Sequence, residues 1–421
     1  MLDTLIEEKK DMKVHLETAL NIGKYLAKEA IWVGDKCNWT GHEVCVINQN
    51  YTNAVKACGI ELYSGLSGIA LFLTELYVKT EDLIILYTLD GVLNSIQFNL
   101  KSNQLNSYGY YSGKVGVGFT LWKIGKKLNR LELVKQGTEI VKSVKEESLG
   151  EHEIDIVSGA AGSISAFLKL YYAEKDQDFL DLAIKSGEFL LKAAIKEPGI
   201  YSWKTVDPNH ALTGYSHGAS GIASALLELY ATTKKEEYWH AAMGGFRYEK
   251  NWFNEQVQNW PDLREYTGEK PLNYGTMWCH GAPGIAIAHL KAYEMTQQEF
   301  FLQEAKTALE TTLQSVVKEA QPNSGANFSL CHGLAGNSDI LLYASDVLQD
   351  SRYRELAEKA GEFGRIQYDA TNTVFPSGVN DPSGATIGQQ ENPGLMLGLA
   401  GTGMFYLRLF DSKSIVSALV P

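Results

Sequence analysis

The chain alternates between two kinds of apolar pattern. In the first kind, apolar residues fall three or four positions apart, which predicts amphipathic helices with one buried face. Segments of this kind are 11–30, 131–144, 180–194 and 302–317. In the second kind, for example residues 69–73 and 222–227, nearly every residue is apolar or small, which predicts helices buried on all sides. The sequence therefore predicts an all-α fold.

A Gly-x-x-Gly motif recurs seven times and opens most of the fully apolar stretches. The first glycines of the copies are Gly65, Gly113, Gly159, Gly218, Gly281, Gly333 and Gly398. Recurrence at roughly 46 to 65 residues, each time before an apolar helix, is typical of a repeated helical hairpin. We therefore expect an α/α toroid, a double-layered α/α barrel of about seven hairpins with inner apolar and outer amphipathic helices. The glycines would permit close backbone approach at the entrances of the inner helices.

Residues 1–421 are predicted to form a single domain, because repeat architectures exceed the usual domain length as one body. Residues 1 to about 60 precede the first motif and are expected to be a helical lead-in. Residues 238–278 combine many aromatic residues with prolines and glycines, which predicts an ordered loop over one end of the ring. This loop is either a functional lid or a cap on the core, and the sequence leaves both open.

Composition and charge indicate the class of protein and the kinds of binding partner to expect. Hydrophobic residues make up 45% of the chain and charged residues 21%, as in a globular protein with a large core. The net charge of -12 argues against nucleic acid as a partner, because phosphate binding needs clustered cations. No uninterrupted apolar stretch is long enough to span a membrane, and the first residues lack the pattern of a signal peptide. We expect no transmembrane segment and a cytoplasmic location.

Five cysteines, an odd number without a secretion signal, favour free or metal-bound thiols over a disulfide framework. The spacing of Cys37, Cys45 and Cys58 fits no compact zinc template, so we interpret these three as ordinary thiols.

The other two cysteines stand in duplicated Cys-His pairs. Cys279-His280 and Cys331-His332 directly precede the first glycines of the fifth and sixth motifs. Equivalent positions of neighbouring repeats would converge at one end of a toroid, where sulfur and imidazole donors suit zinc. The alternative, cysteines packed beside glycines and histidines bonded locally, leaves the duplication unexplained. The pattern therefore predicts a zinc site, but it does not choose between the two histidines.

Two further residues are candidates for acid–base chemistry at the same end. His217 precedes the glycine of the fourth motif, and Asp155 lies four residues before that of the third. A carboxylate near a histidine orients its tautomer and stabilises its cationic form. The alternatives are a merely structural role for His217 and a helix N-cap at Asp155.

These segments resemble the lanthionine synthetase C-like family, the LanC cyclases, across nearly the whole chain. The resemblance rests on Tyr-Ser-His-Gly-Ala-Ser-Gly at 215–221, Trp-Cys-His-Gly-Ala-Pro-Gly at 278–284 and Leu-Cys-His-Gly-Leu-Ala-Gly-Asn at 330–337. Residues 246–249 and 259–264 are similar to the cyclase domain of class II lanthipeptide synthetases, the LanM enzymes. Those enzymes carry an N-terminal dehydratase domain, for which this chain has no room. We expect an excised cyclase domain or a stand-alone relative.

The resemblance implies an α/α toroid with one catalytic zinc ion, held by Cys279, Cys331 and His332. The implied reaction of lantibiotic biosynthesis is intramolecular thia-Michael addition in a dehydrated precursor peptide. A peptide cysteine thiol adds to dehydroalanine or dehydrobutyrine and forms a lanthionine or methyllanthionine thioether. A dehydratase domain or protein is the implied second partner.

The same resemblance assigns the proton chemistry. His217 is the candidate acid that protonates the enolate, and Asp155 its orienting carboxylate or an aid to thiol deprotonation. His280 is a second candidate proton donor beside the metal. Arg264 is either a peptide-binding residue or part of a structural ion pair.

Three alternatives to a cyclase stay open at this stage. A glycoside hydrolase with two carboxylates on an α/α barrel would leave the Cys-His pairs unexplained. A non-catalytic peptide- or thiol-binding module that retains the zinc would not consume thiols. An enzyme that adds a small thiol such as glutathione in trans would increase the mass of its product.

Overall fold

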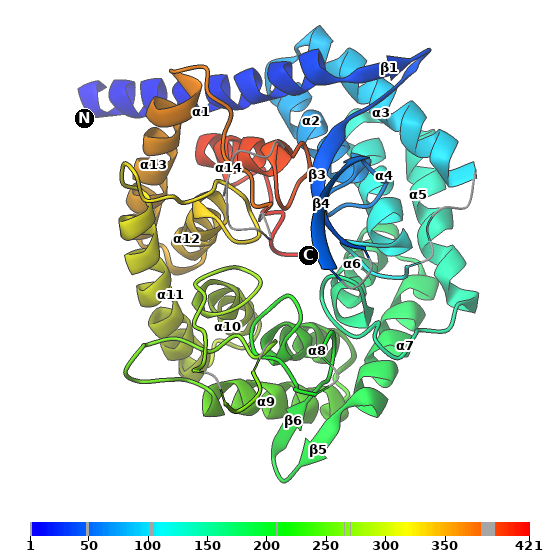
Figure 1. The fold of residues 1–421 in the computed structure, drawn as a ribbon. Helices are drawn as coiled ribbons and strands as arrows, with labels where there is room; N and C mark the ends of the chain where they lie inside the picture. The colour runs from blue at the N-terminus through cyan, green and yellow to red at the C-terminus, as the bar shows by residue number, and fades with distance from the viewer. Residues whose placement is uncertain are drawn as a thin grey trace. The chain divides into compact units, whose positions relative to one another are not determined.

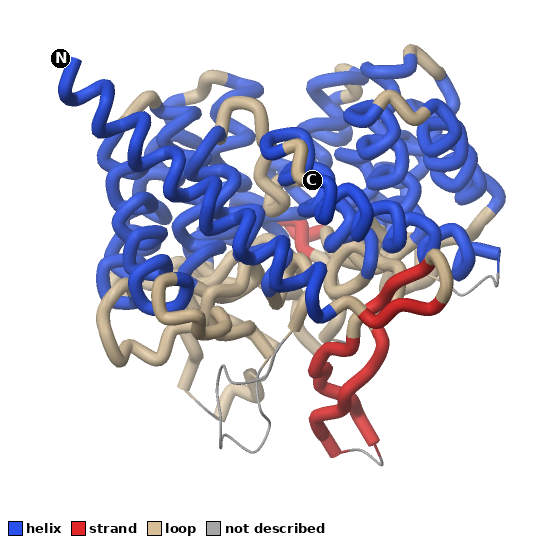
Figure 2. The backbone as a smooth tube through the Cα atoms, turned by 90° about the horizontal axis from the view of Figure 1, so that it is seen from above, coloured by secondary structure: helices blue, strands red, loops and turns tan. Residues whose placement is uncertain are grey.

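The computed structural model describes residues 2–47, 50–101, 105, 107–207, 209–264, 266–269, 271–379 and 392–421. These residues contain fourteen α-helices and three small antiparallel sheets of two strands each (Figure 2). The predicted all-α class is therefore confirmed, with short hairpins added to the helices.

The helices are α1 (Leu2–Glu29), α2 (Leu66–Thr80), α3 (Leu83–Lys101), α4 (Lys114–Leu128), α5 (Leu131–Ser143), α6 (Ala160–Glu174), α7 (Gln177–Ala193), α8 (Ala219–Thr233), α9 (Glu236–Asn251), α10 (Ala282–Thr296), α11 (Glu299–Glu319), α12 (Leu334–Leu348), α13 (Ser351–Gly364) and α14 (Leu399–Asp411). A 3-10 turn η1 (Val144–Glu146) and a π-helical turn η2 (Arg365–Asp369) follow α5 and α13. The strands are β1 (Ile31–Val33), β2 (Lys36–Asn38), β3 (Thr40–Ile47), β4 (Asn50–Ala57), β5 (Ile195–Glu197) and β6 (Ile200–Ser202).

Every Gly-x-x-Gly copy opens an even-numbered helix, as predicted. The first glycine immediately precedes the helix in each case. An odd-numbered helix follows each of the first six, and the pairs α2–α3, α6–α7, α8–α9 and α12–α13 pack against each other (Figure 1). The even helices are the apolar ones: all of residues 219–227 in α8 are buried. The odd helices bury one face, as α7 does with Phe179, Leu182 and Leu190.

The seventh pair joins helices from the two ends of the chain. No further helix follows α14 in residues 412–421, and α14 packs against α1 instead (Figure 1). The rings of His15 in α1 and Tyr406 in α14 have centroids 6.1 Å apart. The helical part of the lead-in thus supplies the partner of the last inner helix.

The chain's contacts divide it into two compact units. The first consists of Met1–Leu105, Ile124–Arg130 and Ser315–Val420, and the second of Asn106–Lys123, Leu131–Gln314 and Pro421. In the first unit, α14 packs against both α2 and α12. In the second, α8 packs against both α6 and α10. Each unit therefore contains a row of neighbouring even-numbered helices.

Two segments differ from the sequence-based expectation. The lead-in is helical only as far as Glu29, because the strands β1 to β4 follow it. Gly34, with a φ of +64°, occupies the two-residue turn between β1 and β2. The expected loop at 238–278 begins only after α9. The aromatic residues of α9 obscured its helical period, in which Tyr238, Ala242 and Phe246 form a buried face.

Helix α3 is long and apolar enough to cross a membrane by length and composition, the only such helix among the described residues. Its residues Ile85, Leu89, Val92 and Ile96 are buried, and it packs against α2 and β2. A core helix of a folded unit meets the same criteria, so α3 is weak evidence for a membrane span.

The second glycine of each motif is required by a close backbone approach. A Cβ atom there would overlap the carbonyl oxygen of the residue six positions earlier. This holds for Gly68, Gly116, Gly162, Gly221, Gly284, Gly336 and Gly401. The loop before each even helix thus folds back onto the first turn of that helix.

We expect Gly162→Ala to lower the free energy of unfolding by about 1–3 kcal/mol, because its methyl group would overlap the backbone carbonyl of Ile156. Gly150→Ala is the matched control, since its Cβ would meet only ordinary contacts with Glu153. Urea unfolding followed by circular dichroism measures both. Equal stability of the two variants would contradict this account of the motif.

Candidate metal centre

Backbone hydrogen bonds join the loops that precede the even-numbered helices. The residue that forms these bonds stands two positions before the first glycine of its motif. In the first unit, the Cys331 amide donates to the Met396 carbonyl at 2.9 Å, and the Met396 amide to the Tyr63 carbonyl at 2.8 Å. In the second, the Ser216 amide donates to the Cys279 carbonyl at 3.3 Å. Both cysteines therefore occupy the same position of a repeated, hydrogen-bonded loop.

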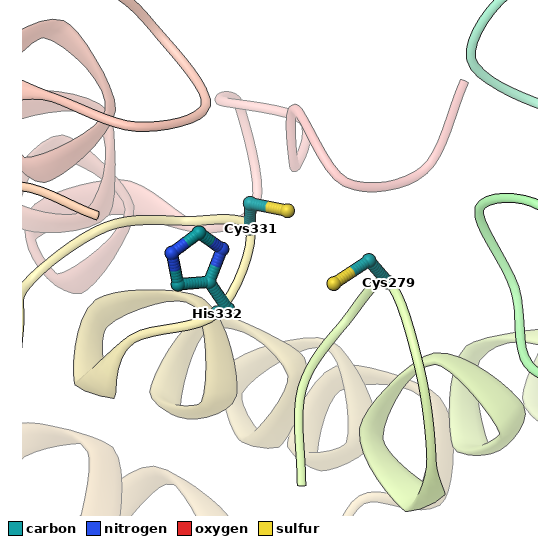
Figure 3. A group of neighbouring side chains, drawn as sticks. All are labelled: Cys279, Cys331 and His332. Carbon is teal, nitrogen blue, oxygen red and sulfur yellow. The ribbon is translucent and has the colours of Figure 1, made fainter. Parts of the chain in front are cut away.

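Three side chains from these loops form a group that could hold a metal ion. The sulfur atoms of Cys279 and Cys331 and a ring nitrogen of His332 all lie within 4.8 Å of one another. Figure 3 shows the two sulfur atoms turned toward each other, with the His332 ring beside Cys331. Both cysteines are buried thiols rather than disulfide halves. Two soft sulfur donors and an imidazole suit zinc, and three protein ligands leave a fourth position open.

Neighbouring groups orient these donors. The Tyr63 hydroxyl donates to the Cys331 sulfur at 2.9 Å. The Nε2 atom of His332 lies 2.6 Å from the carbonyl oxygen of Gly378. Because a carbonyl only accepts, Nε2 carries the proton, and Nδ1 is the nitrogen left to bind a metal.

Sequence reasoning missed Tyr63. It stands in the first repeat at the position that Cys331 occupies in the sixth, so the register of the motif was the signal that could have found it. The remaining cysteines, Cys37 and Cys58, are thiols outside the group. Cys45 lies in β3, but its side chain is outside the described residues.

His217 and Asp155 form a close pair. Nδ1 of His217 lies 2.6 Å from Oδ2 of Asp155, whose side chain is fully buried. Burial lowers the pKa of His217, but the charge of Asp155 and its hydrogen bond more than offset this, and the pKa is raised above 6.5. The negative charge of Cys279 acts in the same direction. Asp155 also accepts from the amide of Ser158 at 2.7 Å, so it stabilises the loop turn as well.

His280 does not belong to the metal-ligand group. It is 1% exposed, and its Nδ1 atom lies 3.9 Å from Oδ1 of Asp262. Burial, followed by the positive charge of Arg264, lowers its pKa to about 3, although Asp262 opposes this. Its ring centroid lies 6.0 Å from that of His217. The structure thus places a neutral imidazole beside a histidine that favours its cationic form.

Arg264 forms an ion pair, one of its two predicted roles. Its Nη2 atom lies 2.6 Å from Oδ2 of Asp262, and Nε donates to the same carboxylate. The Arg264 side chain remains 44% exposed. The pair lies in the loop that follows α9, and it brings a positive charge to the surroundings of His280.

A buried glutamate, which the sequence analysis missed, holds the loop of His217. Glu249 is 1% exposed and accepts hydrogen bonds from the amides of Gly214 and Ser220, both at 3.0 Å. Burial raises the pKa of Glu249 to about 8. An acidic residue on the buried face of an amphipathic helix was the signal that could have revealed it.

The loop after α9 also supports the loop of Cys279. The Asn259 side-chain oxygen accepts from the amide of Ala282 at 2.9 Å and so caps α10. Gly281 adopts a φ of +92°, which favours glycine. The Trp278 ring packs edge-on against the rings of Tyr111 and Tyr215, with centroids 5.4 and 5.9 Å apart. Cys279 is therefore held between a capped helix and an aromatic cluster.

Comparisons with known proteins identify relatives of this chain. The family model described as lanthionine synthetase C-like protein matches residues 57–420. The lacticin 481/lactococcin biosynthesis protein LcnDR2 of Lactococcus lactis subsp. lactis is 25% identical over 431 residues, which cover 99% of this chain and 43% of that protein. This chain therefore spans less than half of that relative's length. The nisin biosynthesis protein NisC of the same organism is 22% identical over 332 residues, covering 71% of this chain and 77% of that protein.

The solved structure of nisin cyclase shares the fold. It superposes with a TM-score of 0.64 at 19% identity, covering 84% of this chain and 89% of that one. The predicted fold class, an α/α toroid, is confirmed by this similarity.

We expect Asp155→Asn to lower the pKa of His217, because burial would then act without the opposing carboxylate. In the native protein, the raised pKa contributes stability that is fully present below about pH 6.5 and is lost as the pH rises through the folded-state value. NMR titration of the histidine ring measures the shift.

The control is Asp181→Asn, which removes an exposed carboxylate from α7. An unchanged His217 pKa in Asp155→Asn would contradict the electrostatic role of Asp155.

Proposed function

Because the chain belongs to the lanthionine synthetase C-like family, as the match over residues 57–420 shows, we propose that it is a zinc-dependent lanthipeptide cyclase. Its substrate would be a dehydrated precursor peptide, within which it joins cysteine thiols to dehydroalanine or dehydrobutyrine. The products are lanthionine and methyllanthionine thioether rings. The observation that carries this proposal is the group of Cys279, Cys331 and His332.

Zinc fits these donors better than a hard cation does, because two of the three are sulfur. When bound there, zinc would lower the pKa of a peptide thiol and hold the thiolate at the open fourth position. The Tyr63 hydroxyl and the Gly378 carbonyl support this role, since they orient Cys331 and His332.

Ring closure forms a bond between the peptide sulfur and the β-carbon of the dehydro residue, and it breaks the S–H bond and the C=C π bond. The π electrons move to the α-carbon and its carbonyl as an enolate. The α-carbon then takes up a proton, while the thiol proton leaves to solvent. The product therefore has the same mass as the substrate.

We assign the proton donor to His217. Asp155 raises its pKa above 6.5, which favours the protonated imidazole that a general acid requires. The negative charge of Cys279, a proposed metal ligand, also raises the pKa of His217, which supports this assignment. His280, neutral and buried beside His217, is the second candidate donor.

The partners follow from the same proposal. The names of LcnDR2 and NisC refer to lacticin 481/lactococcin and nisin biosynthesis, and we extend a lantibiotic role to this chain. Dehydro residues must be made before ring closure, so a dehydratase, as a domain or as a separate protein, would supply the substrate. We propose that both steps take place in the cytoplasm.

We expect Cys279→Ala and Cys331→Ala to lose bound zinc, because each removes one of three protein donors. Cys37→Ala is the control, a buried thiol outside the group. Metal analysis of the purified proteins measures the stoichiometry. Full zinc content in either of the first two variants would rule out this ligand set.

We expect His217→Asn to keep its zinc but to close rings about 10²- to 10⁴-fold more slowly, the usual contribution of general acid catalysis. His240→Asn, which changes an exposed histidine on α9, should leave the rate unchanged. The assay follows loss of free thiols and product mass with a dehydrated peptide.

Three results would contradict parts of this proposal. Free thiols that persist with the unmodified protein would favour a non-catalytic module, and a mass gain with glutathione would favour addition in trans. Zinc loss in His217→Asn would show that His217 is a ligand rather than an acid.

A further inference from the structure

A cavity of about 140 Å³ lies in the first unit, where α1, η2 and the start of α14 meet. Residues that line it are Ile22, Tyr25, Tyr368, Asp369, Phe375 and Leu399. Its edge includes Asn372 and Thr373, which are exposed, so the cavity reaches the surface. Because a cavity of about 150 Å³ holds one benzene molecule, this one has room for a single side chain.

The turn that carries Tyr368 and Asp369 has an uncommon backbone. It is the π-helical turn η2, which continues directly from α13, and such turns are rare and frequent at functional sites. The Thr18 hydroxyl of α1 donates to Oδ2 of Asp369 at 2.8 Å, and the Asn21 side-chain amide donates to Oδ1 at 3.1 Å. These two bonds hold the carboxylate in place at the wall of the cavity.

The carboxylate of Asp369 has neutral hydrogen-bond donors but no ion pair within the part of the chain that the structure describes. Arg365, on the same turn, is held by Glu362, since its Nε and Nη2 atoms each lie 2.7 Å from an oxygen of that carboxylate. Asp369 also raises the pKa of Arg365, but less than Glu362 does. A carboxylate accepts about four hydrogen bonds, so Asp369 can accept from a further donor and keep the bonds to Thr18 and Asn21.

The rest of the cavity wall is largely apolar. The rings of Tyr368 and Phe375 have centroids 5.2 Å apart, and Ile22 and Leu399 are buried. Aromatic rings attract cations, and apolar walls pack against an alkyl chain. A lysine side chain combines an alkyl stem with an ammonium group, so it matches both parts of the wall. The planar guanidinium of arginine prefers both oxygens of a carboxylate at once, whereas both oxygens of Asp369 already accept from α1.

The cavity wall continues into the loop that holds a proposed metal ligand. Phe375 stands three residues before Gly378, whose carbonyl oxygen lies 2.6 Å from Nε2 of His332. The Phe328 amide, in the loop before α12, donates to the Pro376 carbonyl at 2.8 Å. The Phe328 ring also contacts that of Phe375, with centroids 5.3 Å apart. The cavity and the candidate metal centre therefore share one continuous segment of the first unit.

We propose that this cavity binds a primary ammonium group on an alkyl stem, from a lysine side chain of a peptide or from a small free amine. The ammonium group donates a charge-assisted hydrogen bond to Asp369, and the stem packs against Tyr368 and Phe375. The net charge of -12 favours a cationic ligand as well. Only the peptide source rests on the proposed function, in which the lysine belongs to the precursor peptide; binding itself requires neither zinc nor ring closure.

Ligand-observed NMR titration of the full chain tests the proposal, with Nα-acetyl-lysine methylamide and n-butylammonium chloride as probes. Nα-acetyl-norleucine methylamide is the reference, because it has a similar alkyl stem without the ammonium group. We expect at least one ammonium probe to bind more tightly than the reference. Tighter binding of the lysine probe identifies a peptide source, and equal or tighter binding of butylammonium identifies a free amine. Asp369→Asn should weaken this binding about 10-fold, as expected for loss of a charged hydrogen bond.

Two further variants complete the test. Asp181→Asn is the matched control, because this exposed carboxylate of α7 also accepts from a side-chain amide, that of Gln177. Thr373→Trp, at the exposed edge of the cavity, should weaken binding by obstruction while Asp369 stays intact. Circular dichroism checks that all variants fold.

The proposal is overturned if neither ammonium probe binds more tightly than the norleucine reference, or if Asp369→Asn binds as tightly as Asp181→Asn. Ring closure is assayed separately with a dehydrated peptide. A protein that binds an ammonium probe but closes no rings would contradict the proposed function and leave this cavity as an amine site.

Discussion

Backbone hydrogen bonds between neighbouring loops are the constraint on which the site depends. These bonds are formed by the peptide group of the residue two positions before each helix-opening glycine. The backbone at this position is therefore held in place whatever side chain it carries. The glycines then allow the loop to lie against the helix that it starts. The chemistry that each loop can perform therefore depends on the side chain at this position. Tyr63, Ser216, Cys279 and Cys331 are four occupants of it.

Three carboxylates in the second unit serve different tasks. Asp155 faces an imidazole and favours its cationic form, whereas Glu249 faces backbone amides and secures a loop. Glu228 faces an ammonium group and neutralises it. The group that each carboxylate faces therefore decides whether it acts on an imidazole, on the backbone or on another charge.

The repeated helical hairpins were predictable from the sequence, because the glycine spacing and the apolar runs follow directly from how the helices pack. The duplicated Cys-His pairs likewise predicted two of the grouped donors. The choice of His332 over His280 needed the family resemblance, since both occupy the same register. Glu249 and Tyr63 escaped notice because their roles depend on tertiary contacts. The strands β1 to β4 were not predicted, because the expectation for the whole lead-in rested on the helical pattern of its first part.

The pairing of α1 with α14 has a consequence for how this chain folds. His15 and Tyr406, which contact each other, are about 390 residues apart in sequence, whereas the partners of the other hairpins are adjacent. Closing so long a loop costs conformational entropy before any contact between the two helices can stabilise the fold. During synthesis, α1 cannot pack against α14 until α14 has been made. Helix α1 precedes the other described helices in sequence and is thus among the last of them to find its partner.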